Sequence, residues 1–115
     1  MIQRIQPSKR YSEAVIFNGL VFLSGMVPDN LDADATAQTA NVLAQIDALL
    51  TEVGITKSRI VDTTIYLADM ADYTGMNQAW DGWVAIGQAP ARATVEARLA
   101  DPAWKIEIKV TAFRG

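Results

Sequence analysis

The sequence contains neither cysteine nor histidine. The absence of cysteine excludes a disulfide framework, a thiolate nucleophile and any metal site built on cysteine. The absence of histidine removes the side chain that most often serves as a base or metal ligand near neutral pH. Serine-histidine-aspartate and cysteine-histidine catalysis are therefore excluded. Any chemistry must use carboxylates, arginine, lysine, tyrosine, threonine, backbone groups and water.

The chain also lacks long apolar runs and an excess of positive charge. Its 115 residues include 10 lysines and arginines against 13 aspartates and glutamates, for a net charge of −3. The scattered basic residues form no surface for nucleic acid. No apolar run reaches membrane-spanning length, no signal-peptide core begins the chain, and no glycine-rich phosphate loop is present. We expect a single domain over residues 1–115, cytoplasmic, without cofactor, metal, nucleic-acid or membrane partner.

The N-terminal region predicts three short strands. Asn18-Gly19 separates two apolar runs, residues 14–17 and 20–23. Asn-Gly between such runs is the strongest short-range hairpin signal, because both turn positions need positive φ. Residues 2–5 predict an edge strand that ends before Pro7.

A long amphipathic helix is predicted over about residues 34–53, because apolar residues recur there at helical spacing. Asp32 or Asp34 can cap its first turn, and Gly54 suits the position after its end. The apolar stripe consists of Val42, Leu43, Ile46, Leu49, Leu50 and Val53.

The second half predicts a strand over residues 60–67, with Val61, Thr63, Ile65 and Leu67 on one face. A second helix is expected from Asp72 to Gly87, because Tyr73, Met76, Trp80 and Trp83 follow one another at helical spacing. We interpret Met76, Trp80 and Trp83 as helix core.

The last two strands, about residues 89–99 and 104–113, alternate with period two and are predicted to pair as a hairpin. On this interpretation Val95 faces the core, whereas Arg92 and Glu107 share the polar face of the sheet. The element order is then β-β-β-α-β-α-β-β, an α+β fold with two helices on one face of a mixed sheet. The other face is partly apolar, which favours burial by another subunit.

A family resemblance appears in the same stretch. Residues 90–96, Pro-Ala-Arg-Ala-Thr-Val-Glu, followed by residues 105–108, Lys-Ile-Glu-Ile, resemble the C-terminal signature of the Rid (YjgF) family. Residues 30–35 with 38–41, and residues 76–83, look most like its YoaB-type branch. The resemblance covers essentially the whole chain. It implies a chorismate-mutase-like protomer, three of which form a homotrimeric barrel with ligand sites in the clefts between neighbours.

The resemblance assigns roles to two charged residues. Arg92 falls on the arginine that binds the substrate carboxylate, and a guanidinium fork suits that task because it binds a carboxylate with two hydrogen bonds. Glu107 falls on the glutamate that orients or activates the attacking water. From the residues alone, Arg92 could instead form a salt bridge with Glu96, Glu107 or a neighbouring subunit, and Glu107 could be an ordinary solvated strand residue.

Five further positions complete the site that the resemblance implies. Thr94 stands where many family members have cysteine, which rules out thiol chemistry there. Tyr11 matches an aromatic lid residue, and Ser24 and Gly25 match the Ser-Gly at the cleft floor. Asn77 matches a family asparagine, although its spacing to Arg92 is two residues shorter than in the best-studied branch. Tyr11 and Gly25 could equally be a loop anchor and a strand-end turn.

The sequence leaves three candidate functions to be tested. The resemblance implies cofactor-independent hydrolysis of reactive 2-imino or 2-enamino acids to 2-oxo acids and ammonia. An alternative is a non-catalytic trimer that binds a small carboxylate, such as a 2-oxo acid. Nucleic-acid cleavage is a third possibility, but the acidic balance and the lack of histidine argue against it.

Overall fold

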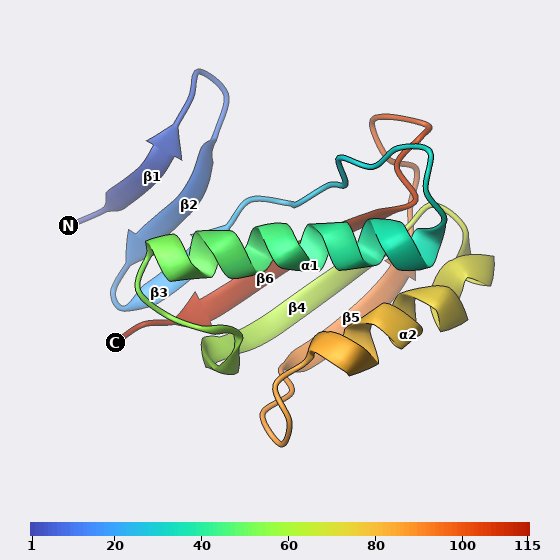
Figure 1. Cartoon of the computed structure of the whole chain (residues 1–115). Helices are drawn as coiled ribbons and strands as arrows, with labels where there is room; N and C mark the ends of the chain where they lie inside the picture. Colours follow the sequence, from blue (N-terminus) through green and yellow to red (C-terminus); the bar gives the residue numbers. More distant parts are fainter.

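Two helices lie on one face of a six-stranded sheet in the computed structural model, which describes all 115 residues (Figure 1). The helices are α1, Ala35–Glu52, and α2, Tyr73–Trp83. The strands are β1 Gln3–Pro7, β2 Ser12–Phe17, β3 Leu20–Leu23, β4 Ile60–Leu67, β5 Ala91–Glu96 and β6 Ile106–Phe113. Short 3-10 turns, Lys57–Arg59 and Met70–Asp72, precede β4 and α2. The predicted α+β fold and element order are confirmed. Neither helix is long and apolar enough to cross a membrane.

The strands follow one another across the sheet in the order β1-β2-β3-β6-β4-β5, and only β4 and β5 are parallel. The predicted hairpin between the last two strands is therefore wrong, because β4 lies between β5 and β6 (Figure 1). Helix α2 supplies the long crossover that a parallel pair requires. Period-two alternation identifies a strand and its two faces, but it does not specify the neighbouring strand.

The predicted Asn18-Gly19 hairpin is confirmed. β2 and β3 pair in antiparallel register up to Phe17 and Leu20. Asn18 and Gly19 have φ values of 56° and 79°, the left-handed backbone that this turn requires. The N–H of Arg114 donates to the carbonyl of Gly19 at 2.7 Å, so the turn also anchors the end of β6.

Helix α1 begins and ends as predicted. The side chain of Asp34 accepts a hydrogen bond from the N–H of Ala37 at 2.9 Å, which satisfies a donor of the first turn. Gly54 follows the helix with a φ of 85°. The whole predicted apolar stripe of α1 is buried.

Helix α2 is shorter than predicted. Asp72 occupies the capping position, but its side chain makes no capping hydrogen bond. The helix ends at Trp83 because Val84 leaves helical geometry with a ψ of 141°, and Gly87 lies in the loop beyond. Met76 and Trp80 are buried in the core, as predicted, and Trp83 packs at its margin.

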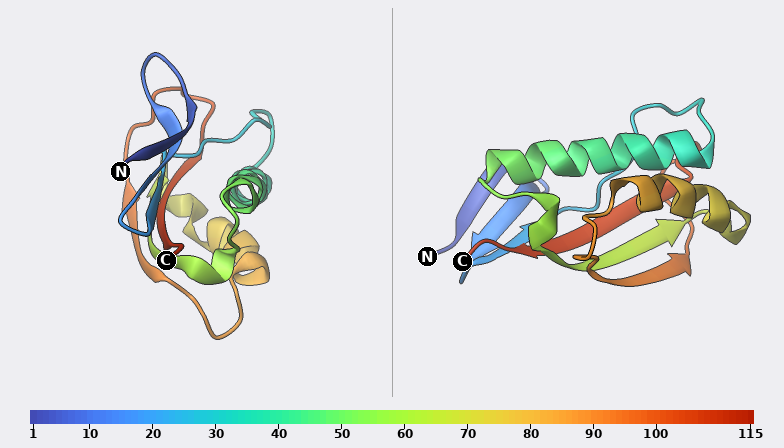
Figure 2. Two further views of the ribbon diagram at one scale, coloured as in Figure 1. Left: turned by 90° about the vertical axis from the view of Figure 1, so that its left-hand side faces the viewer. Right: turned by 60° about the horizontal axis from the view of Figure 1, so that its bottom comes forward.

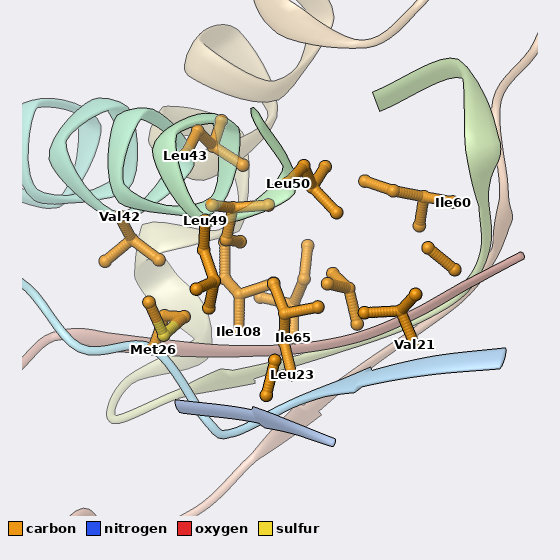
Figure 3. Packing of buried hydrophobic residues seen from close by; sticks show 14 of the residues in the cluster. Val21, Leu23, Met26, Val42, Leu43, Leu49, Leu50, Ile60, Ile65 and Ile108 are labelled. Carbon is orange, nitrogen blue, oxygen red and sulfur yellow. The ribbon is translucent and has the colours of Figure 1, made fainter. Parts of the chain in front are cut away.

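The core lies between the helices and the sheet and contains 20 buried apolar residues (Figure 3). Val42 and Leu49 of α1 point toward the sheet there, and Leu43 and Leu50 belong to the same cluster. Burial of this size is the main stabilising term for a domain of this length.

One predicted facing in β4 is wrong. Thr63, Ile65 and Leu67 face the core, but Val61 is 47% exposed. A register irregularity between Ile60 and Asp62 turns Val61 outward, because a bulge shifts the alternation of the strand by one residue.

No helix covers the opposite face of the sheet (Figure 2). This open face carries several large apolar side chains that are 38–46% exposed: Phe17, Phe22, Val95 and Phe113. The expectation of a partly apolar, uncovered face is confirmed. Exposed apolar area of this kind marks an interaction surface.

Candidate functional site

Arg92 lies on β5 and directs its guanidinium toward α2. The β4–β5 register places Arg92 beside Thr63, which is buried on the helix-covered face. Nη1 of Arg92 donates to Oδ1 of Asn77 at 2.8 Å, and Nη2 donates to the hydroxyl of Tyr73 at 3.3 Å. The predicted facing of β5 is therefore wrong: Arg92 and Thr94 face the helices, and Val95 faces the open side.

Aromatic rings hold the guanidinium in place. Its central carbon lies 5.2 Å from the centroid of the Trp80 ring and 6.0 Å from that of Tyr73. These contacts and the bond to Asn77 fix the plane of the fork before a ligand arrives. None of these partners is anionic, so the positive charge of Arg92 remains available to a carboxylate. We call Tyr73, Asn77, Trp80, Arg92 and Thr94 the Arg92 half-site.

The alternative of a salt bridge within the protomer is wrong for Arg92. Glu96, two residues past Thr94, instead accepts a hydrogen bond from the N–H of Met70 at 2.9 Å. Glu107 points to the other face of the sheet. The Arg92 side chain is thus fixed by neutral groups alone.

Two buried hydroxyls near Arg92 have no hydrogen-bond partner. They belong to Thr94, on the same strand, and to Thr63, directly beside Arg92 on β4. A buried polar group without a partner costs about 1–3 kcal/mol. Each hydroxyl can donate and accept, but both oxygens are enclosed by protein atoms, and neither threonine lines a hollow.

Glu107 lies on β6 between Ile106 and Ile108, which are both fully buried. Its side chain therefore points to the open face, as predicted. There it helps to line a hollow of about 370 Å³. The hollow is lined by Tyr11, Ser24, Gly25, Val27, Trp104 and Glu107. We call Tyr11, Ser24, Gly25, Trp104 and Glu107 the Glu107 half-site.

Gly25 leaves room for the Glu107 carboxylate. A Cβ atom at Gly25 would lie 2.1 Å from Oε2 of Glu107 and 3.0 Å from its Cδ. The backbone around Gly25 is fixed, because the N–H and carbonyl of Met26 both bond to Ile108. The N–H of Gly25 itself has no acceptor in the protomer, so it is a free donor next to the carboxylate.

The remaining residues of this half-site have free polar groups. Tyr11 is 58% exposed, and its carbonyl accepts from both the N–H and the hydroxyl of Ser8, which fixes the loop but leaves the ring free. The hydroxyl of Ser24 has only the weak acceptor Sδ of Met26, at 3.9 Å. Both can therefore turn toward a ligand in the hollow.

The two half-sites lie on opposite faces of one protomer. In the row that crosses β6, β4 and β5, Glu107 pairs with Tyr66 and Tyr66 with Val95, all on the open face. Arg92 belongs to a row with Thr63 on the helix-covered face. The expectation that Arg92 and Glu107 share a face is wrong, because β5 directs Arg92 to the helix-covered face and Val95 to the open face. A ligand can touch both residues only where two copies of the chain meet.

Gly25→Ala is expected to separate activity from stability. The clashing atoms are the far end of a flexible side chain, so the Glu107 carboxylate swings away and the fold is retained. We expect a melting temperature within a few degrees of wild type and a loss of turnover approaching that of Glu107→Gln. The double variant should lose little more than either single variant, because both remove the same group. A fully active Gly25→Ala protein, or fully additive losses, would contradict this role.

Sequence reasoning missed four residues of these surroundings. Tyr73 was assigned only to the helix, and Thr63 only to a strand face; their roles depend on the β4–β5 register. Trp104 was assigned only to the start of the last strand, but β6 begins at Ile106 and Trp104 lies in the connection before it. Lys109 follows Glu107 on the same face, and its Nζ donates to the carbonyl of Leu23. Burial lowers the pKa of Lys109.

No cluster of acidic side chains is arranged to hold a metal ion.

Fold and site define a class of protein: a chorismate-mutase-like α+β protomer with two incomplete ligand half-sites, one on each face of its sheet. A family model described as endoribonuclease L-PSP matches residues 1–114. The chain therefore belongs to this family, which is also known as the Rid, YjgF or RutC family.

Individual relatives align with this chain over nearly its full length. The RutC family protein YoaB of Escherichia coli K12 is 54% identical over 111 residues, 96% of each chain. A RutC family protein of Haemophilus ducreyi is 53% identical over 97% of this chain and 96% of its own. The crystal structure of NMB1025, a YjgF family member from Neisseria meningitidis, matches with a TM-score of 0.95 and 56% identity, over 100% of this chain and 96% of that one. The predicted family and its YoaB-type likeness are confirmed.

Proposed function

We propose that the protein hydrolyses reactive 2-imino and 2-enamino acids to 2-oxo acids and ammonia, without a cofactor, in clefts between the subunits of a homotrimer. The observation that carries the proposal is the complementarity of the two half-sites. One presents a fixed cation, and the other presents a carboxylate with a free N–H. Each lacks what the other supplies, and the exposed apolar groups of the open face favour association.

In this proposal Arg92 of one subunit binds the substrate carboxylate through its fork. An enamine first takes a proton at its terminal carbon and becomes the imine. The imine carbon then lies beside Glu107 of the neighbouring subunit, whose carboxylate accepts a proton as water adds to that carbon. The carboxylate passes this proton to the nitrogen and gives a carbinolamine. A second proton, from the carbinolamine hydroxyl, then reaches the nitrogen as the C–N bond breaks, and ammonia leaves with the electron pair. The carbon retains the oxygen of water as the carbonyl of the 2-oxo acid.

The catalytic contribution of the site is mainly positioning and electrostatics. Such imines hydrolyse slowly in water without help, so the site needs only to align water, carbon and carboxylate. Histidine and cysteine are not required for any step. The N–H of Gly25 and the hydroxyl of Ser24 supply hydrogen bonds to the nitrogen or the developing oxygen.

The second candidate function is a trimer that binds a small carboxylate without turnover. It is favoured by the preformed Arg92 half-site, which contains the groups needed to bind a carboxylate but no carboxylate of its own to activate water. An ammonia-release assay decides between the two. Imines generated in situ by an amino-acid oxidase should yield ammonia faster with the protein than without it, whereas a pure binder leaves the rate unchanged.

The ligand class is testable without turnover. A small carboxylate, such as a 2-oxo acid or benzoate, is expected to raise the melting temperature by mass action, because it binds the folded protein at Arg92. The corresponding neutral amide should have no such effect, since it offers no charge to the guanidinium. The measurement is a thermal melt at several ligand concentrations. Equal shifts with acid and amide would show that Arg92 has only a structural role.

A further inference from the structure

A second hollow adjoins the Glu107 half-site on the open face. It has a volume of about 470 Å³. Gly25 and Glu107 line both this hollow and the first one. Its other walls include Tyr66, Arg98 and Lys109. The carboxylate of Glu107 therefore borders both spaces, and a ligand at Glu107 lies next to the second hollow.

The second hollow contains more positive than negative charge. Lys109 and Arg98 line it, and Glu107 is the single carboxylate among its walls. Lys109 uses one donor on the carbonyl of Leu23, and an ammonium has three. Arg98 is exposed just after the end of β5. Two donors of Lys109 and the fork of Arg98 thus remain for an anion.

The hydrogen bond to the Leu23 carbonyl gives Lys109 a structural role, but it uses only one of the three donors of the ammonium. Its stem could cover the same sheet surface as a methionine, and burial of an ammonium disfavours its charged form. An anionic group of a ligand would offset that cost, since it would stabilise the charge that burial disfavours.

The distances suit one small molecule. Lys109 and Glu107 are two residues apart on one face of a strand, which places them about 7 Å apart along it. A substrate whose imine carbon lies at Glu107 would direct its side chain toward Lys109 and Arg98. A second acidic group at the end of a four- or five-carbon chain would reach the two cations.

We propose that Lys109 and Arg98 form a subsite for a second acidic group, so that the substrates are dicarboxylic 2-imino acids in preference to monocarboxylic ones. This inference rests on the proposed function, in which Arg92 binds the carboxylate next to the reacting carbon. Lys109 and Arg98 then determine specificity through the far end of the substrate.

The test compares two 2-oxo acids with the same five-carbon chain, 2-oxopentanoate and 2-oxoglutarate, by isothermal titration of the intact protein. Wild type should bind 2-oxoglutarate at least about 10-fold more tightly, the scale of a charge-assisted hydrogen bond. Lys109→Met and Arg98→Gln should each reduce this advantage while leaving the affinity for 2-oxopentanoate nearly unchanged. Lys109→Arg should retain it. Lys57→Met is the matched control. Lys57 lines none of the hollows, and its ammonium lies over the Trp83 ring, so this variant should keep the wild-type preference for 2-oxoglutarate.

Arg98→Glu provides an independent test if Lys109→Met folds poorly. The exposed position tolerates the change. The new negative charge should repel the second carboxylate and make 2-oxopentanoate the better ligand. The subsite would be overturned if wild type bound the two acids with equal affinity. It would also be overturned if the double variant Lys109→Met, Arg98→Gln kept the full preference for 2-oxoglutarate. Either result would leave the proposed function standing. Binding of neither acid by wild type would overturn the proposed function itself.

Discussion

Glu107→Gln is expected to lower kcat by about 100-fold or more, the usual scale for a general acid–base group. Glutamine keeps the shape of the side chain, and the room provided by Gly25 accommodates either one. It loses the carboxylate that accepts a proton from water. Carboxylate binding should change little, because the binding cation lies in the Arg92 half-site on the other face of the sheet. The measurements are steady-state ammonia release and titration with a 2-oxo acid.

Glu96→Gln is the matched control for this change. Glu96 is a strand glutamate whose carboxylate accepts from the N–H of Met70, outside both half-sites. It should retain wild-type kcat. If Glu107→Gln also hydrolyses an imine at the wild-type rate, Glu107 is not the residue that activates water, and the mechanism fails although the fold is unaffected.

Arg92→Lys is expected to weaken carboxylate binding by at least about 10-fold and to lower kcat/KM by a similar or larger factor. Charge-assisted hydrogen bonds contribute about 1.5–3 kcal/mol, and 1.4 kcal/mol corresponds to 10-fold. Lysine keeps the positive charge but loses the planar fork that Asn77, Tyr73 and Trp80 hold in place. A carboxylate would be attracted but not oriented, so binding and turnover should decline together.

Arg59→Lys offers a control in a similar setting. Arg59 lies over the Phe113 ring at 5.4 Å and donates to the Phe113 carbonyl, remote from both half-sites. It should leave the affinity for carboxylates unchanged. Wild-type affinity in Arg92→Lys, with normal folding, would mean that the carboxylate binds elsewhere.

Features with local causes could be predicted from the sequence. The Asn18-Gly19 turn depends on the φ preferences of two residues, and α1 depends on a stripe of apolar side chains between Asp34 and Gly54. The alternation of β6 correctly placed Glu107 on the face opposite the core. Such patterns need no knowledge of distant parts of the chain.

The errors arose where the outcome depends on non-local packing. β5 has polar Arg92 and Thr94 on the side that packs against α2, and alanines with Val95 on the open side. On an edge strand with both faces partly covered, the apolar side of the alternation does not identify the core. This reversed facing of β5 places Arg92 on the face opposite Glu107. The resemblance named the site residues. Only the strand register showed that Arg92 and Glu107 lie on opposite faces of the sheet within one protomer.

The central claim is that each active site combines the Arg92 half-site of one subunit with the Glu107 half-site of another. It can be tested by mixing two impaired proteins, Arg92→Lys and Glu107→Gln. Each variant keeps the half-site that the other lacks. Co-expression at equal levels, with different tags, allows mixed trimers to be purified and their size checked by sedimentation.

In each purified mixed trimer, one of the three clefts combines an intact Arg92 with an intact Glu107, so we expect recovery of about a third of wild-type ammonia release. The two separately assembled proteins, combined without subunit exchange, should show only their low individual rates. Mixed trimers with no more activity than the mean of the two variants would contradict a shared site and place the chemistry within a single protomer.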